Sequence, residues 1–428
     1  MKFFHVSDLH FGKTLYDVRL VEKDQPYWID QFLKAVDEHQ PDVVVIAGDI
    51  YDRKQPSDEA IVLFERLLSG LAKRGKTVFV VPGNHDSNVK LSQFSEFLEE
   101  KNIFIAREVK KEIEHHEVGG VVFWLMPFFY PLLVADTRVF DDPDIDSYDK
   151  AARALIEAQD IDTSKCNVII SHQNVIADGV KPVHSDSESS IGGVGEIEYS
   201  AYDKFDYVAL GHIHNGQSIG RDTIIYSGCP LFYDFSEEGR DKKVVMVEVN
   251  ESGRISKEDI SFIDVPLLHK IRTFTGTVDD LVEEGKAFTD KNDYYVLCTV
   301  NARTVSSVDR DKLNAVFGSC LIHIGKSDGT DDSGENGGDP ERKKIKKTNI
   351  KAAFEDFYQE KTGDFLDDVQ LDVIEKMIEQ QSRNPQSYIA LSNSSENKKK
   401  CEAETDELLD FLLAAIDKIE DQNGEGEA

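Results

Sequence analysis

Short clusters of aspartate, asparagine and histidine recur along the first half of the sequence, and such side chains can bind metal ions or transfer protons. Five clusters stand out, DLH, GDIYD, GNHD, SHQ and GHIH, which contain Asp8, His10, Asp49, Asp52, Asn84, His85, His172, His212 and His214. Each cluster alone has an ordinary explanation, such as a helix cap, a turn or a satisfied core histidine. The ordered set is far more specific, because every cluster directly follows an apolar run.

The donor types restrict the ion that could bind. Aspartate, histidine and asparagine without cysteine suit Mn²⁺ or Fe²⁺ better than a closed zinc cage. Seven donors are too many for one ion and suit two ions that share a carboxylate, and Asp49 is the natural bridge because it ends the central apolar run. Paired ions about 3.5–4 Å apart stabilise the attacking and leaving oxygens of phosphoryl transfer. The clusters therefore predict a binuclear phosphoesterase site.

The apolar runs before the clusters are predicted to be buried strands. They span residues 3–7, 42–49, 77–84, 121–126, 167–171, 207–210, 223–227 and 243–249. Residues 26–39 and 58–74 have helical spacing and lie between the first three strands. This alternation predicts an α/β layered sheet, in which ligands bind at the carboxyl ends of the strands.

Within GNHD, the role of Asp86 stays open at this level. Asp86 could cap the following helix or take part in catalysis. Asn84 and His85 could likewise be turn residues, metal ligands or proton donors. The ten residues VFVVPGNHDS do not decide among these roles.

The length of 428 residues predicts two or three domains. Residues 265–326 read as strand, helix, strand, helix, strand, and a Gly/Asp/Ser-rich linker is predicted at 327–347. Residues 348–428 have amphipathic helical spacing, and these helices could pack back on the protein or bind a partner.

Composition narrows the class of protein. The net charge of −32 argues against wrapping nucleic acid by bulk electrostatics, but a local site could still meet phosphates through bound cations. The five cysteines are scattered, which fits reduced thiols. We expect cytoplasmic residence, because the N-terminus does not resemble a signal peptide and the longest apolar stretch is short and broken by prolines.

The ordered set D-x-H, GDxxD, GNHD, H and GHxH resembles the calcineurin-like metallophosphoesterases, and AGDIYD, PGNHDS, ALGHIH and the segment 226–249 resemble the DNA-repair nucleases among them. The resemblance implies an α/β fold: a layered β-sandwich flanked by helices, with a nuclease domain at 1–264. It also implies a small α+β DNA-capping domain at 265–326 and C-terminal helices at 348–428 that bind a partner ATPase.

The resemblance also implies a role for each site residue. One ion would be held by Asp8, His10, Asp49 and His214, and the other by Asp49, Asn84, His172 and His212. His85 would protonate the leaving oxygen, and Asp52 would orient His85. Two divalent ions are expected, with Mn²⁺ favoured, while Lys13, Arg53 and Lys54 could contact phosphates.

The implied function is a DNA nuclease for repair, recombination and replication, with exonuclease activity on double strands and endonuclease activity on single strands and hairpins. Its expected partners are DNA and an SMC-family coiled-coil ATPase, in a heterotetramer that contains a homodimer of this chain. The main alternative is a binuclear phosphodiesterase or phosphatase with a non-DNA substrate. A non-catalytic scaffold is a second alternative, which the intact donor set disfavours.

Overall fold

The computed structural model describes residues 1–185, 195–250, 253–302 and 304–326. They belong to the first of the two units of the chain, Met1–Thr330. The predicted linker at 327–347 and the predicted helices at 348–428 lie outside the described residues. Among the described helices, none is long and apolar enough to cross a membrane.

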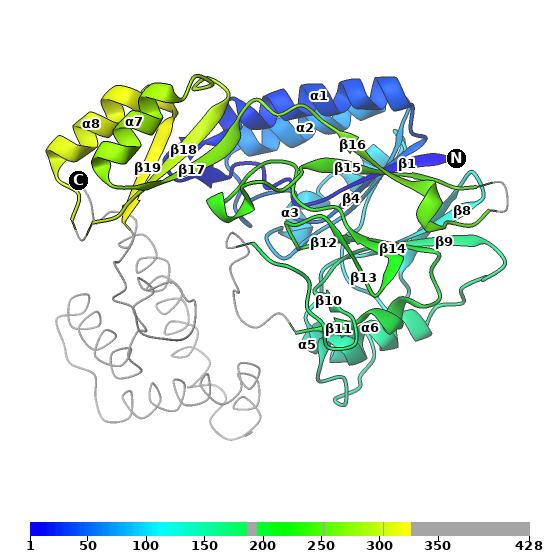
Figure 1. Ribbon diagram of the computed structural model, residues 1–428. Coiled ribbons are helices and arrows are strands. Elements are labelled where there is room, and N and C mark those ends of the chain that lie inside the picture. Colours follow the sequence, from blue (N-terminus) through cyan, green and yellow to red (C-terminus); the bar gives the residue numbers. More distant parts are fainter. Residues whose placement is uncertain (186–194, 251–252, 303, 327–428) are drawn as a thin grey trace, which may run out of the picture. The chain divides into compact units, whose positions relative to one another are not determined.

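The first of two large sheets contains the N-terminal strand. Its strand order is β16-β15-β1-β4-β5-β6 (Figure 1). The strands span β1 Lys2–Val6, β4 Val43–Ala47, β5 Thr77–Val81, β6 Ile103–Ile105, β15 Lys243–Glu248 and β16 Ile260–Asp264. Strands β1, β4, β5 and β6 are parallel, so their carboxyl ends share one edge, whereas β15 is antiparallel to β1. Helices α1 (Asp24–His39) and α2 (Asp58–Ala72) connect the first three of these parallel strands.

The second large sheet has the order β13-β14-β12-β9-β8-β7. Its strands span β7 Glu114–Val118, β8 Val121–Met126, β9 Cys166–His172, β12 Tyr207–Gly211, β13 Gln217–Ile219 and β14 Arg221–Tyr226. The shorter helices are α3 Asn88–Leu91, α4 Ser95–Glu99, α5 Pro131–Ala135 and α6 Tyr148–Glu157. Two two-stranded sheets complete this part of the chain. One pairs β2 Thr14–Leu15 with β3 Val18–Arg19, and the other pairs β10 Val175–Ile176 with β11 Ile197–Glu198.

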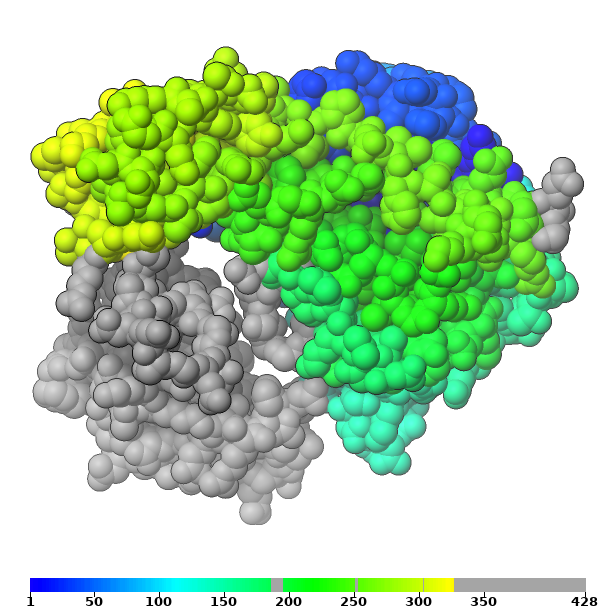
Figure 2. Space-filling model, viewed as in Figure 1, coloured from blue at the N-terminus to red at the C-terminus, as the bar shows by residue number. Residues whose placement is uncertain are grey.

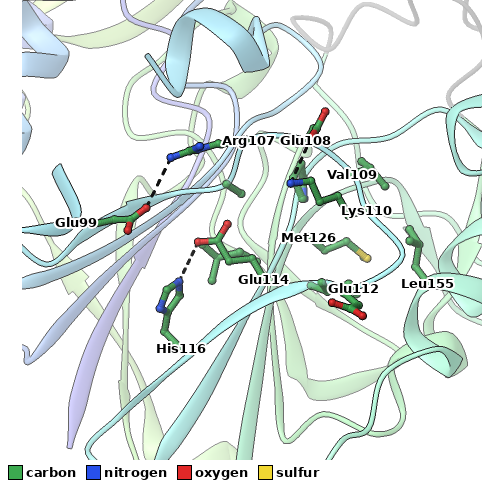
Figure 3. Close-up of a pocket in the computed structure, with 14 residues that line it drawn as sticks. Glu99, Arg107, Glu108, Val109, Lys110, Glu112, Glu114, His116, Met126 and Leu155 are labelled. Carbon is green, nitrogen blue, oxygen red and sulfur yellow. Dashed lines mark hydrogen bonds and ion pairs between the residues drawn. The ribbon is translucent and has the colours of Figure 1, made fainter. Parts of the chain in front are cut away.

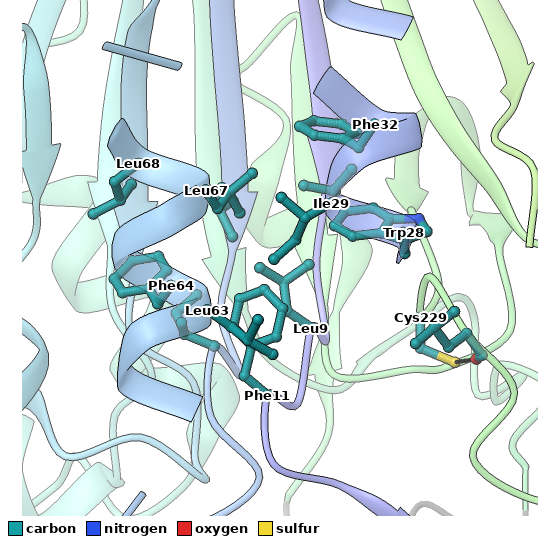
Figure 4. Close-up of a cluster of buried hydrophobic side chains, with 14 of the residues drawn as sticks. Leu9, Phe11, Trp28, Ile29, Phe32, Leu63, Phe64, Leu67, Leu68 and Cys229 are labelled. Atoms are coloured by element: carbon teal, nitrogen blue, oxygen red, sulfur yellow. Dashed lines mark hydrogen bonds between the residues drawn. The ribbon is translucent and has the colours of Figure 1, made fainter. Parts of the chain in front are cut away.

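Alternating side chains explain why the sheets stack. Along β1, Phe3 packs against residues of the second sheet, such as Phe123, whereas Phe4 packs with the helices. Helices α1 and α2 cover the outer face of the first sheet with side chains that include Trp28, Ile29, Phe32, Leu63, Phe64, Leu67 and Leu68 (Figure 4). Central strands buried on both faces read as continuous apolar runs, which is why the sequence predicts them. The predicted α/β sandwich is confirmed.

A small three-stranded parallel sheet follows the sandwich. It consists of β17 Lys270–Gly276, α7 Val278–Ala287, β18 Tyr294–Val300, α8 Ser307–Phe317 and β19 Leu321–Lys326, in the predicted order of strands and helices. Both helices begin with a capping box, Thr277 with Asp280 and Ser306 with Asp309. Residues 270–326, coloured yellow-green to yellow, form one continuous block in the space-filling view (Figure 2).

Candidate metal centre

The predicted donor side chains meet where strands of the two large sheets end. Asp8 and His10 follow β1, Asp49 follows β4, Asn84 follows β5, His172 ends β9, and His212 and His214 follow β12. Because β1, β4 and β5 are parallel neighbours, and β9 and β12 are too, their carboxyl ends bring the loops together.

Asp49 lies between two groups of donors. On one side, its Oδ2 is 3.6 Å from His10 Nε2, which is itself 3.1 Å from His214 Nε2. Asp8 completes this group, with Oδ1 4.0 Å from His214 Nε2. The distances place Asp49 where a carboxylate could contribute to this group and to a second one.

The second group contains His172, Asn84 and His212. His172 Nε2 lies 3.3 Å from the same Oδ2 of Asp49 and 3.2 Å from Asn84 Oδ1. His212 Nδ1 lies 3.1 Å from Asn84 Oδ1. All seven expected ligands are therefore close together, and Asp49 is the residue that faces both groups.

Three of the histidine rings are oriented through their Nδ1 atoms. His172 Nδ1 donates to the Ala47 carbonyl at 2.8 Å, so its Nε2 faces the centre. His10 Nδ1 faces Asp52 Oδ1 at 3.6 Å, and His214 Nδ1 faces Glu237 Oε1 at 3.9 Å. Metal-binding histidines typically have such partners, because the partner fixes the tautomer and the ring orientation.

The backbone at the ligands is held in an uncommon conformation. Asp8, His10, Asp49 and His212 have φ values of 53°, 41°, 50° and 95°. Residues other than glycine adopt this region at a cost, and they persist there when the surroundings hold them. Here the amides of Asp8 and His10 donate to the Gly48 and Asp49 carbonyls, both at 3.0 Å. Gly83 contacts Asp49 so closely that a Cβ at position 83 would collide with the carboxylate.

Asp86 joins the two loops that carry Asp49 and Asn84. Its carboxylate accepts hydrogen bonds from the backbone amides of Ile50, Tyr51 and Gly83 at 3.0, 3.0 and 2.9 Å. Asp86 is buried and caps no helix. This geometry matches neither the helix cap nor the catalytic role that the sequence leaves open. The carboxylate of Asp86 instead binds backbone amides of the two loops and so positions the ligands that these loops carry.

His85 and Asp52 are arranged differently from the expectation. His85 Nδ1 lies 2.8 Å from the backbone carbonyl of Asp52, so the ring donates to the backbone and not to the carboxylate. The Asp52 carboxylate instead faces His10 and accepts from Lys13 Nζ at 3.0 Å. Residue spacing identifies Asp52 as a neighbour of the site, but it cannot tell a side-chain contact from a backbone contact.

Burial and neighbouring charges leave His10, Asp49 and His212 in the protonation states that bind metal, whereas burial raises the pKa of Asp8. Burial lowers the pKa of His10 well below its usual value and that of His212 to about 3. Burial would raise the pKa of Asp49, but the nearby His172 outweighs it and holds that pKa well below normal. Burial alone would lower the pKa of His172, but the nearby Asp49 carboxylate outweighs burial and raises this pKa to about 9. His172 is therefore protonated without a metal, and binding a cation would release its proton.

The donor set fits divalent ions. Two carboxylates, four imidazoles and one amide oxygen, without a thiol, face one another over 3.1–4.0 Å. Nitrogen and oxygen ligands of these types suit divalent ions such as Mn²⁺ or Fe²⁺. The buried Nδ1 of His10 has no hydrogen-bond partner and faces Asp52 Oδ1 at 3.6 Å, as a histidine faces its carboxylate behind a bound metal. The residues present therefore fit two ions.

A buried ion pair behind His214 was missed by the sequence reasoning. Glu237 Oε2 lies 2.7 Å from Lys242 Nζ, and the two side chains are 0% and 2% exposed. Glu237 also accepts from the Tyr233 amide at 3.2 Å, and the Tyr233 hydroxyl donates to the Leu9 carbonyl at 2.7 Å. The segment that resembles the repair nucleases thus supports the ligand loops from behind. Only the burial of Glu237 reveals this role, and its position in an acidic stretch gives no signal.

A second group of charged residues lines a cavity that is separate from the predicted ligands. A cavity of about 340 Å³ is lined by Glu99, Arg107, Glu108, Lys110, Glu114 and His116, among others (Figure 3). Their charges pair with one another, as in Lys110–Glu108 at 3.3 Å and Arg107–Glu99 at 3.9 Å. This cavity contains none of the predicted ligands.

The comparisons with known proteins agree with this site. A family model described as calcineurin-like phosphoesterase matches residues 1–216. The SbcD subunit of the SbcCD nuclease from Staphylococcus epidermidis is 31% identical over 382 residues, which cover 88% of this chain and 98% of that protein.

Two solved structures also match. The phosphoesterase Yfce from E. coli is 11% identical with a TM-score of 0.26, covering 62% of this chain and 100% of its own. A dimetal phosphatase from Danio rerio is 12% identical with a TM-score of 0.31, covering 62% and 99%. The family match and the identity to the curated relative show that the chain belongs to the calcineurin-like phosphoesterases and, within them, to the SbcD family.

Proposed function

We propose that the chain is the nuclease subunit of an SbcCD-type complex. It would act as an exonuclease on double-stranded DNA and as an endonuclease on single strands and hairpins, in repair, recombination and replication. The observation that carries the proposal is the gathering of seven expected ligands, with Asp49 between two groups of them, in a chain that spans 98% of a nuclease relative.

Each site residue has a proposed role in phosphodiester hydrolysis. Asp8, His10, Asp49 and His214 would hold one divalent ion, and Asp49, Asn84, His172 and His212 the other. When bound, the ions, which we propose to be Mn²⁺, would supply Lewis-acid activation of the attacking water and the scissile phosphate.

His85 would deliver the proton to the leaving oxygen. Its Nδ1 is occupied by the Asp52 carbonyl at 2.8 Å, which leaves Nε2 as the ring atom that can carry that proton. Asp52 would orient His10 through the Asp52 carboxylate and orient His85 through the Asp52 backbone carbonyl.

Arg53 and Lys54 are the better candidates for DNA contacts among the three expected basic residues. Both side chains are exposed on the loop after Asp52, although Arg53 lies 3.8 Å from the Asp52 carboxylate, whereas Lys13 is 19% exposed and pairs with Asp52 at 3.0 Å. Exposed cations beside the ligands offer phosphates a local attraction despite the negative net charge.

The proposed partner is an SbcC-like SMC-family ATPase, which would bind the predicted helices at 348–428 outside the described residues. We also propose a homodimer within a heterotetramer. Val89, Phe94 and Phe97 around α3 and α4 are 83%, 64% and 72% exposed, which supports a protein contact there. Cytoplasmic residence belongs to this proposal.

The proposal is tested by cleavage assays with the purified chain. Incubation with Mn²⁺ and a labelled hairpin or blunt duplex, with and without an SbcC partner, should give metal-dependent cutting that EDTA abolishes. Turnover of a chromogenic diester without DNA cleavage, even with the partner present, would favour a phosphodiesterase or phosphatase with another substrate. Less than one bound ion per chain after dialysis would favour a non-catalytic scaffold.

A second experiment tests the proposed ATPase partner. The full chain should capture an SbcC-type ATPase in a pull-down, whereas a chain truncated after Thr348 should not. Equal capture by both chains would place the binding surface elsewhere.

A further inference from the structure

A second cavity, of about 390 Å³, adjoins the metal centre on the side of Asn84. Asn84 lies in its wall, and Phe128, Tyr130 and Leu133 supply apolar surface. This volume lies within the range of small-molecule sites. Because Asn84 is both an expected metal ligand and part of this wall, the cavity lies next to the metal centre.

Aromatic side chains connect the cavity to the ligands. The Phe128 ring lies 6.5 Å from the ring of His172 on one side and 5.0 Å from Tyr130 on the other, at interplanar angles of 76° and 90°. The Phe128 amide donates to the Pro82 carbonyl at 3.0 Å, which ties this wall to the loop of Asn84. Tyr130 and Leu133 are 45% and 47% exposed, so they offer apolar surface to a ligand.

The charges of the cavity suit an anionic ligand. Lys54 and Lys90 lie in its wall, and Lys90 Nζ also donates to the Lys54 carbonyl at 3.3 Å. Asp86 is the acidic residue in the wall, but its carboxylate is turned to three backbone amides. An aromatic platform beside cations is the combination that binds single-stranded nucleic acid.

We propose that this cavity binds one unstacked nucleotide of the DNA strand, next to the phosphate held at the metal centre. The base would lie against Tyr130 and Leu133, and the flanking phosphate would meet Lys54 and Lys90. This inference rests on the proposed nuclease function and adds a substrate preference to it. A paired base does not fit such a subsite, so single strands, hairpin loops and frayed ends are the better substrates.

The test compares variants on a single-stranded oligonucleotide with Mn²⁺. Tyr130→Ala should lower kcat/KM by about 5- to 100-fold, the range of base–aromatic stacking, while Tyr130→Phe should keep most of the activity. Leu132→Ala is the matched control, because Leu132 is a 44% exposed apolar residue on the same helix as Leu133 that does not line the cavity. Turnover of a chromogenic diester by each variant reports whether the metal centre is intact.

Substrates with one abasic position provide a readout that a structural defect would not change. Moving the abasic position along the oligonucleotide should reveal one place beside the cut where the wild-type chain loses activity. The Tyr130→Ala variant should be insensitive at that place. Equal losses for Tyr130→Ala and Leu132→Ala, or the same abasic pattern in both chains, would overturn the subsite alone. A wild-type chain that hydrolyses the diester but cuts no DNA would overturn the proposed function and the subsite with it.

Discussion

The buried pair of Glu237 and Lys242 behind His214 provides a prediction with a calculable size. Lys242 outweighs burial and holds the pKa of Glu237 below its usual value, so both side chains are charged in the folded protein. Glu237→Gln leaves the Lys242 ammonium buried without its carboxylate. Breaking a buried pair in this way costs about 3–5 kcal/mol. This is a large fraction of a typical unfolding free energy of about 5–15 kcal/mol.

The double variant Glu237→Gln/Lys242→Met separates stability from metal binding. Removing both charges should recover most of the lost free energy of unfolding, because replacing a buried ion pair by uncharged side chains often leaves stability unchanged. The ion beside His214 should nevertheless bind about 10–100-fold more weakly, since Glu237 no longer faces His214 Nδ1. Urea unfolding in EDTA measures the first quantity, and calorimetric titration with Mn²⁺ measures the second.

The control for this prediction is an exposed ion pair. Lys2 and Glu248 lie 3.6 Å apart with exposed side chains, so Glu248→Gln should change neither stability nor metal binding appreciably. Full metal affinity in the double variant would refute the positioning role of Glu237. An unchanged free energy of unfolding in the single variant would refute the buried charge pair itself.

Three further predictions concern residues around GNHD. His85→Ala should retain both ions and DNA binding but lose cleavage by about 10²–10⁴-fold, and loss of an ion in this variant would contradict its role as an acid. Asp49→Ala should empty or scramble the centre, as metal analysis after dialysis can show; one full ion retained per chain would argue against a shared carboxylate. Asp86→Ala leaves three buried amides without an acceptor, each costing about 1–3 kcal/mol, while Asp86→Asn should recover part of the loss by keeping one oxygen acceptor. Wild-type stability of the alanine variant in urea would contradict this role.

The strands that carry the ligands could be predicted because the sheets bury them on both faces. Residues Val121–Met126 match the predicted strand, and β4 and β5 lie inside the predicted runs. The edge strands of the two large sheets escaped prediction, because one face meets solvent and the sequence turns polar. Thus β7 reads Glu-His-His-Glu-Val, yet His116 packs on Phe104 and His115 on Trp124.

The ligands could be predicted from the sequence, but the residues that position them could not. Each ligand lies directly after an apolar run, so both the strand and its ligand can be recognised within a few residues of the sequence. The roles of Glu237 and Asp86 depend on which groups they reach across the fold, namely His214 and the amides after Asp49. The cavity beside Asn84 likewise arises only when Tyr130, which follows β8 of the second sheet, meets the loop after β5.

The central claim is that two ions sharing Asp49 are needed to cut DNA. Titrating Mn²⁺ into the metal-free chain, while following cleavage of a labelled hairpin with any SbcC partner held constant, tests it most directly. We predict that cleavage rises with the second equivalent of bound ion and that Asp49→Ala stays inactive throughout. Full cleavage at one bound ion per chain, or cleavage by Asp49→Ala, would contradict the shared binuclear centre.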